Sequence, residues 1–257
     1  MTGLPSSAEP KLAGRTAVIT GGASGMGRAA SVLFAAHGAH VVIADRDAEA
    51  TRSTLAEISA AGGSAEGHRV DVGDQAGLGD WADSLDHDVV DVFFNHAGLP
   101  GPAGWRFDAD DWNETMVVNV WAPMELTKRL LPRLRASSHA SLIYTASTAG
   151  IRAVPGLFTY AASKGALVQF VRSLAVQLAP EGIRANAICP GATDTPALRR
   201  DIEDGTLRAS LDQIAAHIPM RRLGTTDDVA RTALFLASDD SAYLTGLAIP
   251  IDGGATA

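Results

Sequence analysis

The sequence has one cysteine, no long apolar run and no excess of basic residues. Cys189 is alone among 257 residues, which excludes an intrachain disulfide and a thiolate metal cluster. We expect it to lie in the core. The formal net charge of −8 argues against nucleic acid or an anionic membrane as a partner, since both require a basic patch. Apolar runs such as 89–94 are too short to cross a bilayer. We therefore expect a soluble, cytoplasmic protein.

The first residues contain serine and proline and lack the basic start and apolar stretch of a secretory signal. We expect residues 1–12 to form a flexible tail. The rest of the chain shows no linker, composition shift or solenoid-type repeat that would separate two domains. The sequence therefore predicts a single domain over residues 13–257.

Short β-branched apolar runs alternate with glycine or polar turns and longer stretches of helical spacing. Most of these runs are almost continuously apolar, as in strands that are covered on both faces. The sequence predicts an α/β fold, a doubly wound parallel sheet of about seven strands with helices on both faces. The expected strands are 16–20, 40–45, 68–72, 89–95, 140–146, 183–189 and 247–251.

An expected helix at 158–179 is apolar on nearly all sides. Leu167, Phe170 and Val171 share one face, and Val168 and Val176 extend the apolar surface to the other side. A helix of this kind is usually buried on both sides. We expect its inner side to lie on the sheet and its outer side to meet a second subunit, giving a homo-oligomer, either a dimer or a tetramer.

A glycine-rich turn follows the first expected strand and precedes the helical run 28–37. Glycines allow a sharp turn and a close approach of a pyrophosphate, which the first N–H groups of the helix would bind. In this position the turn favours a dinucleotide over a simple corner and indicates a Rossmann-type fold. The expected contacts are Gly21, Ser24, Gly25, Met26 and Gly27.

Asp45 ends the second expected strand, a little over twenty residues after the turn. There a carboxylate accepts hydrogen bonds from both adenosine ribose hydroxyls. It would repel a 2′-phosphate about 4 Å away by about 4 kcal/mol at an effective dielectric of about 20, which favours NAD over NADP. Arg46 would offset part of this repulsion. The simpler alternative is that Asp45 is a turn or helix-cap residue.

Tyr160 and Lys164 are four residues apart at the start of the helix expected at 158–179, so they share a face. A phenol with a pKa near 10 needs a shift of about 3 units to act as a base at neutral pH, and a nearby ammonium supplies much of it. Without context, such a pair is more often two exposed helical residues.

These features stand in an order that resembles the classical short-chain dehydrogenase/reductase family over about residues 14–254. The motifs are the glycine turn, Asp45, Asn95-His96-Ala97-Gly98, Asn119, Ser147, Tyr160 with Lys164, and Pro190-Gly191. The resemblance implies that Ser147 holds the substrate oxygen and that Tyr160 exchanges the proton. It implies that Lys164 lowers the tyrosine pKa and binds the nicotinamide ribose beside Tyr160, and that Asn119 anchors a relay water.

The resemblance implies further cofactor contacts. Asp71 and Val72 would frame the adenine, and Asn95, Ala97 and Gly98 would border the adenosine ribose. The nicotinamide would lie against Pro190, Gly191, Thr193 and Thr195. Two residues depart from the commonest family pattern, His96 in place of a second asparagine and Thr193 in place of a branched apolar residue. We interpret His96 as structural.

Pro123 follows Asn119 by four residues on one expected helix and has no N–H to bond the Asn119 carbonyl. The free carbonyl would receive the relay water beneath Lys164, or Pro123 only bends the helix. The other histidines are scattered in the sequence and form no close pair with metal-ligand spacing, so no metal is expected.

The segments expected around the substrate are mainly apolar, although Arg152, Arg199 and Arg200 leave an anionic substrate open. Their apolar members are Leu99, Pro100, Trp105, Val154, Phe158, Leu198, Ile202, Leu207 and Leu211. We expect residues 193–222 to form a substrate lid that is disordered without ligand. The sequence thus predicts an NAD(H)-dependent oxidoreductase for a secondary alcohol or ketone, apolar or cyclic.

Two alternatives stay open. One is an NADPH-dependent 3-oxoacyl-thioester reductase on the same fold, which Asp45 disfavours. The other is a catalytically silent NAD(H)-binding sensor, which the presence of Ser147, Tyr160 and Lys164 disfavours, although a fold alone cannot exclude it.

Overall fold

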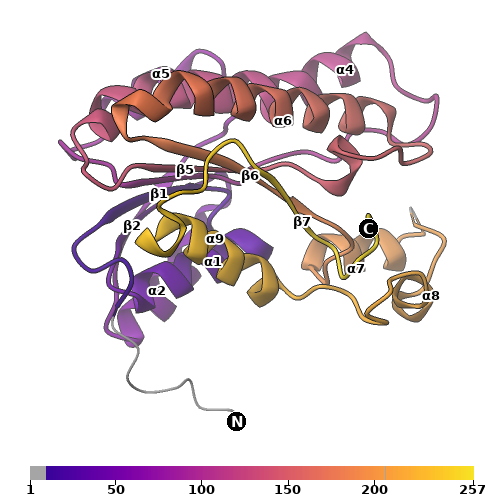
Figure 1. The fold of residues 1–257 in the computed structure, drawn as a ribbon. Helices are drawn as coiled ribbons and strands as arrows, with labels where there is room; N and C mark the ends of the chain where they lie inside the picture. The colour runs from indigo at the N-terminus through magenta and orange to yellow at the C-terminus, as the bar shows by residue number, and fades with distance from the viewer. Residues whose placement is uncertain (1–9, 206) are drawn as a thin grey trace.

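The computed structural model describes residues 10–205 and 207–257 and contains one seven-stranded parallel sheet (Figure 1). Its strand order is β3-β2-β1-β4-β5-β6-β7, which confirms the predicted doubly wound arrangement. The strands are β1 (Thr16–Thr20), β2 (His40–Asp45), β3 (Ser64–Arg69), β4 (Val92–Asn95), β5 (Ser141–Thr145), β6 (Arg184–Pro190) and β7 (Ala248–Ile251).

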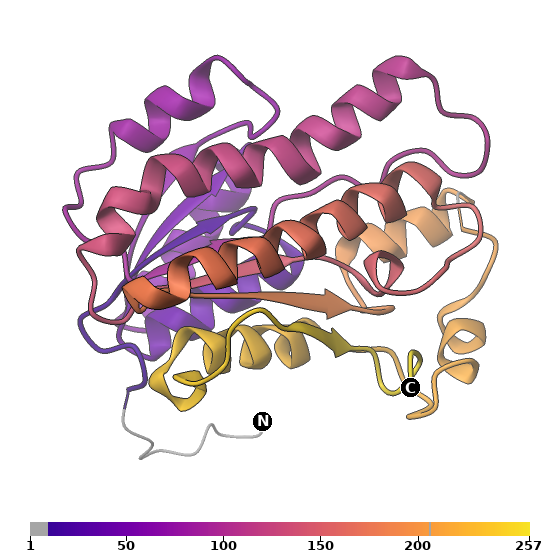
Figure 2. The ribbon, with the colours of Figure 1, turned by 45° about the horizontal axis from the view of Figure 1, so that its top comes forward.

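Helices cover both faces of the sheet. Figures 1 and 2 show the helices of one layer lying together across the sheet from those of the other. One layer contains α1 (Gly25–Ala36), α2 (Ala48–Ala60) and α9 (Thr226–Ala237). The other contains α3 (Gly77–Asp83), α4 (Ala109–Met116), α5 (Ala122–Arg135) and α6 (Phe158–Leu178). The sheet therefore separates two apolar cores.

Alternate residues of the central strands enter the two cores because successive side chains point to opposite faces. On β2, Val42 packs in the core under α5 and α6, whereas Val41 and Ile43 pack under α1 and α9. Tyr144 on β5 is fully buried, and its hydroxyl lies 2.6 Å from Thr127 Oγ1. The buried phenol thus has the partner that its polar end requires.

The third strand differs from its prediction. The apolar residues at 70 and 72 suggested a strand at 68–72, but β3 spans Ser64–Arg69, which is largely exposed and polar. It is the edge strand of the sheet and pairs only with β2 among the described residues. An edge strand need not be apolar on both faces, so its sequence carries a weaker signal than the central strands.

The expected N-terminal tail is only partly open to description, because residues 1–9 lie outside the described residues. Leu12, which we assigned to that tail, is fully buried in the core beneath α1 and α9. Its N–H donates to the His37 carbonyl at 2.9 Å, and Lys11 forms an ion pair with Asp240. Residues from Lys11 onward therefore belong to the packed fold.

The long helix α6 lies almost where its spacing predicts. Leu167, Val168 and Val171 are buried, whereas Val176 is 79% exposed on the outer side. Among the described residues, no helix combines the length and apolar character needed to cross a membrane.

Two short helices follow β6 and lie apart from the main layers, near the C-terminus (Figure 1). They are α7 (Pro196–Glu203) and α8 (Leu211–Ala216), and neither has a buried residue. They occupy the segment expected to be a substrate lid. Short 3-10 turns complete the fold at η2 (Thr148–Gly150), η3 (Ala179–Glu181) and η4 (Asp239–Ser241).

Candidate active site

The carboxyl ends of the parallel strands meet at one edge of the sheet, where nearly all the candidate residues lie. Strands β1 and β4 are neighbours, but the chain leaves them toward opposite sides, to β2 and to β5. A crevice at such a switch point is the usual ligand site of an open α/β sheet. The candidate residues are therefore grouped at this edge.

The glycine turn runs from the end of β1 into α1. Gly21 and Gly25 have φ angles of +65° and +51°, a conformation that favours glycine. A Cβ on Gly27 would lie 2.0 Å from the Gly21 carbonyl oxygen, so this position admits no side chain. Ser24 precedes α1 without a side-chain cap bond. The exposed backbone and the start of the helix fit a pyrophosphate group.

Thr20 fixes the turn after β4 against the glycine turn, a role that the sequence analysis missed. Its Oγ1 accepts hydrogen bonds from the backbone N–H groups of His96 and Ala97 at 3.0 and 3.2 Å. A Cβ on Gly21 would lie 3.1 Å from Ala97. The two turns are therefore in contact, and a cofactor lying across one meets the other.

A hollow of about 580 Å³ opens beside the ends of β2 and β3 and is lined by Arg46, Asp47, Arg69 and Asp71. Asp45 stands next to it and accepts a hydrogen bond from the Ala23 N–H at 3.0 Å. The Asp45 carboxylate therefore already contacts the glycine turn. The hollow suits the adenosine part of a dinucleotide.

Arg69 was not among the expected site residues. It pairs with Asp45 in the register of β2 and β3, which places a second arginine near Arg46. The wrong position expected for the third strand concealed it, because a strand at 68–72 places Arg69 within the strand rather than at its end. The pairing register of the edge strand β3 with β2 is the information that would have identified Arg69 as a site residue.

The structure brings Ser147, Tyr160 and Lys164 together. Ser147 follows β5, and its side chain lies near enough to Tyr160 to affect the pKa of that phenol. Lys164 lies one turn further along α6, with Nζ 5.7 Å from the centre of the Tyr160 ring. Lys164 is only 3% exposed, and Nζ donates to the Thr145 carbonyl at 2.7 Å. The hypothesis of an exposed helical pair is therefore wrong.

Burial dominates the electrostatics of this group. It raises the pKa of Tyr160, and the nearby Ser147 side chain offsets only part of that effect. It also lowers the pKa of Lys164 to about 8. In this structure Tyr160 is therefore a proton donor at neutral pH, and the lowering of its pKa expected from Lys164 is not seen. The charge of Lys164 is directed at the Thr145 carbonyl instead.

Asn119 is fully buried within η1 (Val117–Trp121), a π-helical turn between α4 and α5. Its Oδ1 accepts from the Leu99 N–H at 2.8 Å, and its Nδ2 donates to the Leu99 carbonyl at 2.8 Å and to Ser163 Oγ at 2.9 Å. The side chain thus links the loop after β4 to α6. Pro123 begins α5 just after this turn, and the relay water at the Asn119 carbonyl stays a prediction.

His96 packs against Phe94, and its Nδ1 lies 2.9 Å from Thr145 Oγ1. Burial and, to a smaller extent, the charge of Lys164 together lower its pKa to about 4. A neutral imidazole at this place supports the interpretation of His96 as a structural residue.

Cys189 is fully buried, and burial raises its pKa to about 11, as suits a core thiol.

The segment after β6, where the nicotinamide contacts were expected, lies close to the glycine turn. The Gly191 N–H donates to the Ile251 carbonyl at 3.0 Å, and a Cβ there would meet Asp252 at 2.8 Å. Thr195 caps α7, and its methyl group lies 3.9 Å from where a Gly25 side chain would begin. The glycine turn and the residues after Pro190 therefore face one another.

Other expected contacts lie at the same edge. Asn95 ends β4 and is 3% exposed, and a Cβ on Gly98 would lie 3.1 Å from both Asn119 Oδ1 and Lys164 Nζ. Asp71 follows β3 and accepts from the Gly73 N–H at 2.8 Å, and Val72 packs on the core. Thr193 forms an isolated bridge to Gly224. These expected contacts thus lie at or near the carboxyl ends of the strands.

Two aromatic side chains stand together at the start of α6, near Tyr160 in the sequence. The rings of Trp105 and Phe158 are 4.4 Å apart, and Trp105 is 82% exposed. The Gly104 N–H donates to the Gly156 carbonyl at 2.7 Å, which fixes the loop of Trp105 against the start of α6. Phe158 precedes Tyr160 by two residues in α6, so this aromatic pair forms an apolar rim at the start of that helix.

Comparisons with known proteins agree with this geometry. A family model described as Enoyl-(Acyl carrier protein) reductase matches residues 21–256. A 2,5-dichloro-2,5-cyclohexadiene-1,4-diol dehydrogenase, LinX, of Sphingobium indicum is 38% identical over 250 residues, covering 95% of this chain and 97% of that protein.

Solved structures are similar over the same length. A 7α-hydroxysteroid dehydrogenase complexed with NADH and 7-oxo glycochenodeoxycholic acid has a TM-score of 0.88 at 31% identity, covering 96% of both chains. The Pseudomonas aeruginosa RhlG/NADP active-site complex also has a TM-score of 0.88, at 34% identity, covering 96% of this chain and 98% of that one. The similar structures thus include both forms of the dinucleotide.

Proposed function

The chain belongs to the classical short-chain dehydrogenase/reductase family, whose members are oxidoreductases that act on CH–OH groups with a nicotinamide dinucleotide. Within this family activity, we propose a more specific function. It is an NAD(H)-dependent dehydrogenase for an apolar or cyclic secondary alcohol or ketone. The observation that carries this proposal is the meeting of Ser147, Tyr160 and Lys164 at the carboxyl end of β5, with Lys164 Nζ 5.7 Å from the centre of the tyrosine ring.

The proton chemistry belongs to these three side chains. The bound nicotinamide supplies the hydride acceptor in oxidation and the hydride donor in reduction. Ser147 hydrogen-bonds the substrate oxygen and orients it toward Tyr160. In reduction, Tyr160 gives its proton to that oxygen, which suits a phenol whose pKa is raised by burial. In oxidation, Tyr160 must first lose the proton, and Ser147 offsets part of the effect of burial that opposes this loss.

The cofactor fits the crevice on several independent observations. The glycine turn has no room for a side chain at Gly27, and the start of α1 offers unpaired N–H groups. Asp45 carries a carboxylate where a ribose would lie, which supports NAD. The hollow beside it suits the adenosine, with Asp71 and Val72 toward the adenine and Asn95 and Ala97 toward its ribose.

The substrate class is supported by the rim of Trp105 and Phe158. Aromatic rings gain most by contact with apolar or ring-shaped surfaces. LinX acts on a cyclic diol and the hydroxysteroid dehydrogenase holds a steroid, so both are similar proteins with ring substrates. We propose that residues 193–222, with α7 and α8, close over such a substrate. Faster hydrogen exchange in this segment than in the sheet is the expected sign.

We also propose a homo-oligomer through the outer side of α6. Val176 is 79% exposed there, and Met124 on α5 is also exposed. Exposed apolar groups on two helices of one layer favour association. Light scattering at micromolar concentration tests this, and a monomer would contradict it.

The first test is NADH formation from NAD⁺ with a panel of secondary alcohols that includes cyclic and steroidal ones. Wild type is compared with Tyr160→Phe, and NADP⁺ replaces NAD⁺ in parallel. Turnover that requires Tyr160 and prefers NAD⁺ is the expected result. Binding of NADH without turnover of any member would favour the silent sensor instead.

A second candidate is an NADPH-dependent 3-oxoacyl-thioester reductase. Arg46 and Arg69 line the hollow beside Asp45 and would bind a 2′-phosphate, and a 3-oxoacyl-[acyl-carrier-protein] reductase of Thermotoga maritima is 33% identical over 247 residues. Competition between NADH and NADPH in the reduction of a 3-oxoacyl thioester separates the two candidates.

A further inference from the structure

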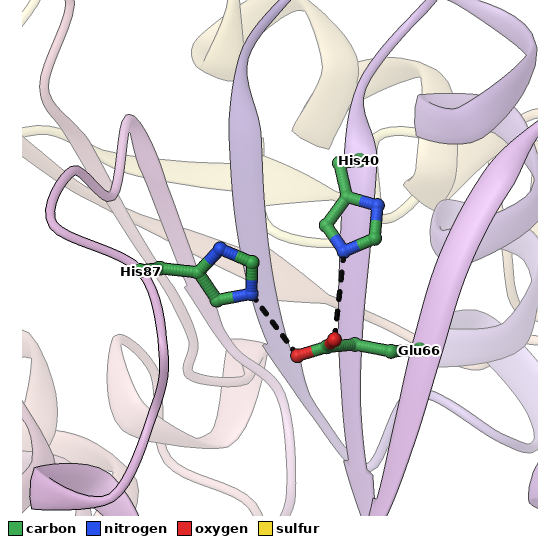
Figure 3. Close-up of side chains that lie close together, drawn as sticks. All are labelled: His40, Glu66 and His87. Atoms are coloured by element: carbon green, nitrogen blue, oxygen red, sulfur yellow. Dashed lines mark hydrogen bonds and ion pairs between the residues drawn. The ribbon is translucent and has the colours of Figure 1, made fainter.

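Three histidines gather around one carboxylate at the β2–β3 edge of the sheet. We define this histidine cluster as His40, Glu66, His68 and His87. Figure 3 shows the imidazoles of His40 and His87 both directed at the Glu66 carboxylate. The sequence analysis expected the histidines to stay apart, and for these three the structure shows otherwise.

The cluster forms because of strand register. His40 begins β2 and is paired with Ser64, and Glu66 and His68 follow Ser64 at alternate positions of β3. Alternate residues of a strand share one face. The intervening Gly67 faces Thr51 of α2, so Glu66 points to the opposite face of the sheet. His87 reaches that face from the loop between α3 and β4.

The His87 loop is held in place by Arg133. Its guanidinium donates to the carbonyls of His87 at 2.9 Å, Leu85 at 2.9 Å and Asp83 at 3.1 Å. The charge of Arg133 is therefore directed at backbone oxygens. His87 is the least exposed imidazole of the cluster, with 19% of its side chain exposed. A loop fixed in this way presents its imidazole without a large ordering cost.

The distances in the cluster are close to those of a metal site. Nε2 of His87 is 3.0 Å from Glu66 Oε1, and Nε2 of His40 is 3.8 Å from Glu66 Oε2. One ligand atom from each of these three residues lies within 4.8 Å of the other two. Tetrahedral zinc with bonds of about 2.0 to 2.1 Å holds its ligand atoms about 3.3 Å apart. Small side-chain movements are sufficient to reach that geometry.

The groups behind these ligands orient them. His40 Nδ1 lies 2.7 Å from Ser64 Oγ, which leaves its Nε2 toward Glu66. His68 Nε2 lies 3.1 Å from Glu66 Oε1, and the His68 ring packs edge-on against Trp81 at 6.1 Å. Metal-binding imidazoles and carboxylates almost always have such hydrogen-bonded partners.

We propose that His40, Glu66 and His87 bind one divalent transition-metal ion, zinc by preference, with His68 and Ser64 orienting the ligands. Two imidazoles and one carboxylate leave a fourth position for water. The ion would replace the contacts between the imidazoles and the carboxylate and would link β2, the edge strand β3 and the loop before β4.

The ligand chemistry selects the ion. Imidazole nitrogens suit zinc and other late first-row metals, whereas magnesium and calcium prefer oxygen ligands. Glu66 supplies one carboxylate oxygen beside the two imidazole nitrogens, a ligand set that zinc accepts.

This site is separate from the catalytic one and does not depend on the proposed reaction. Strands β3 and β5 are four strand spacings apart, about 19 Å. Binding to the folded state alone stabilises it by mass action. The expected result of occupancy is therefore a more stable edge of the sheet with unchanged chemistry at Tyr160.

The test uses the full chain without an affinity tag, made metal-free with EDTA and dialysed. Zinc chloride is titrated by calorimetry, and cobalt(II) is added separately to follow the visible bands of tetrahedral coordination. We expect one equivalent of zinc per chain. At a hundredfold excess over Kd, we expect a rise in Tm of about 5 to 10 °C. Magnesium chloride at equal concentration should leave Tm unchanged.

Variants locate the ion. Glu66→Gln and the double variant His40→Gln/His87→Gln should abolish the zinc-dependent rise in Tm, and His68→Gln should weaken zinc binding by about 10- to 100-fold. His139→Gln is the matched control, because His139 is also paired with a carboxylate, Asp239 at 3.2 Å, but has no second imidazole. That variant should bind zinc as wild type does.

The cobalt spectrum of the wild-type protein tests metal binding by the cluster even where a variant fails to fold. The absence of tetrahedral bands, an equal response to magnesium, or zinc stabilisation that survives in folded Glu66→Gln would each overturn the proposal. The cluster would then be an ion-pair network of one carboxylate and three imidazoles.

Discussion

The catalytic crevice and the histidine cluster are two polar sites on one sheet, and they are assembled in different ways. Ser147, Tyr160 and Lys164 lie within one short stretch of chain that runs from the end of β5 into α6. The cluster draws on the start of β2, the middle of β3 and the loop before β4. The first arrangement depends on local spacing and the second on strand register.

The two sites also differ in burial and charge. Lys164 is 3% exposed and its pKa is lowered to about 8, so the crevice keeps a cation where solvation is poor. Glu66 has 40% of its side chain exposed and is surrounded by three imidazoles. A buried charged group with a shifted pKa is typical of a catalytic site. The cluster is instead open to exchange with ions from solvent.

Tyr160→Phe gives the largest expected difference between the two sites. Loss of the proton donor should lower kcat/KM by about 10³-fold or more, as for removal of a general acid–base group. The rise in Tm with zinc should be unchanged. Tyr243→Phe is the matched control, because Tyr243 is fully exposed, and it should keep wild-type turnover. Equal losses in both variants would contradict the assignment.

Lys164→Met should lower kcat/KM by about 10²-fold while the free energy of unfolding at pH 7 rises by about 1 kcal/mol. Lowering a lysine pKa from 10.5 to about 8 costs about 3 kcal/mol below pH 8, at 1.36 kcal/mol per unit. The lost hydrogen bond to the Thr145 carbonyl offsets part of this gain.

The pH dependence of unfolding gives the sign of this effect. Between pH 8 and 10.5 the unfolded state binds more protons at Lys164 than the folded state, so wild-type stability should rise with pH in that window. Denaturant unfolding at several pH values measures the slope. Lys164→Met should lack this contribution, and a steeper rise in the variant would contradict it.

Asp45→Asn should lower the preference for NAD over NADP, measured as the ratio of kcat/KM values, by about 10- to 100-fold. The substitution removes the charge that repels a 2′-phosphate but keeps an oxygen for the Ala23 N–H. Asp47→Asn is the control, since asparagine caps α2 as well as aspartate does. A similar change of preference in both variants would show that the total charge of the hollow decides.

Trp105→Ala has the smallest expected effect, a rise in KM for a cyclic alcohol of about 3- to 10-fold with little change in kcat. An aromatic pair contributes about 0.5 to 1.5 kcal/mol, and Trp105 would lose its contact with Phe158 and with the substrate. Trp105→Phe should restore most of the affinity. A fall in kcat alone would place Trp105 in loop closure instead.

Much of the fold and of the candidate site could be predicted from the sequence because the relevant patterns involve residues that are close together in the chain. The central strands are continuous apolar runs, and β1 and β2 begin and end where the sequence predicts. The glycine turn between β1 and α1 and the four-residue spacing of Tyr160 and Lys164 place chemical groups without knowledge of distant contacts. The doubly wound sheet follows from the alternation of strands and helices.

Tertiary structure alone decided the position of β3, the place of Arg69 in the hollow and the meeting of His40, Glu66 and His87. An exposed edge strand has little apolar pattern to fix its boundaries, and a shift in register changes every cross-strand neighbour. The same burial that assembles the crevice also raises the pKa of Tyr160 where local spacing alone predicted a lowering. Local spacing determines which groups share a helix face, whereas register and burial determine what those groups meet and how they ionise.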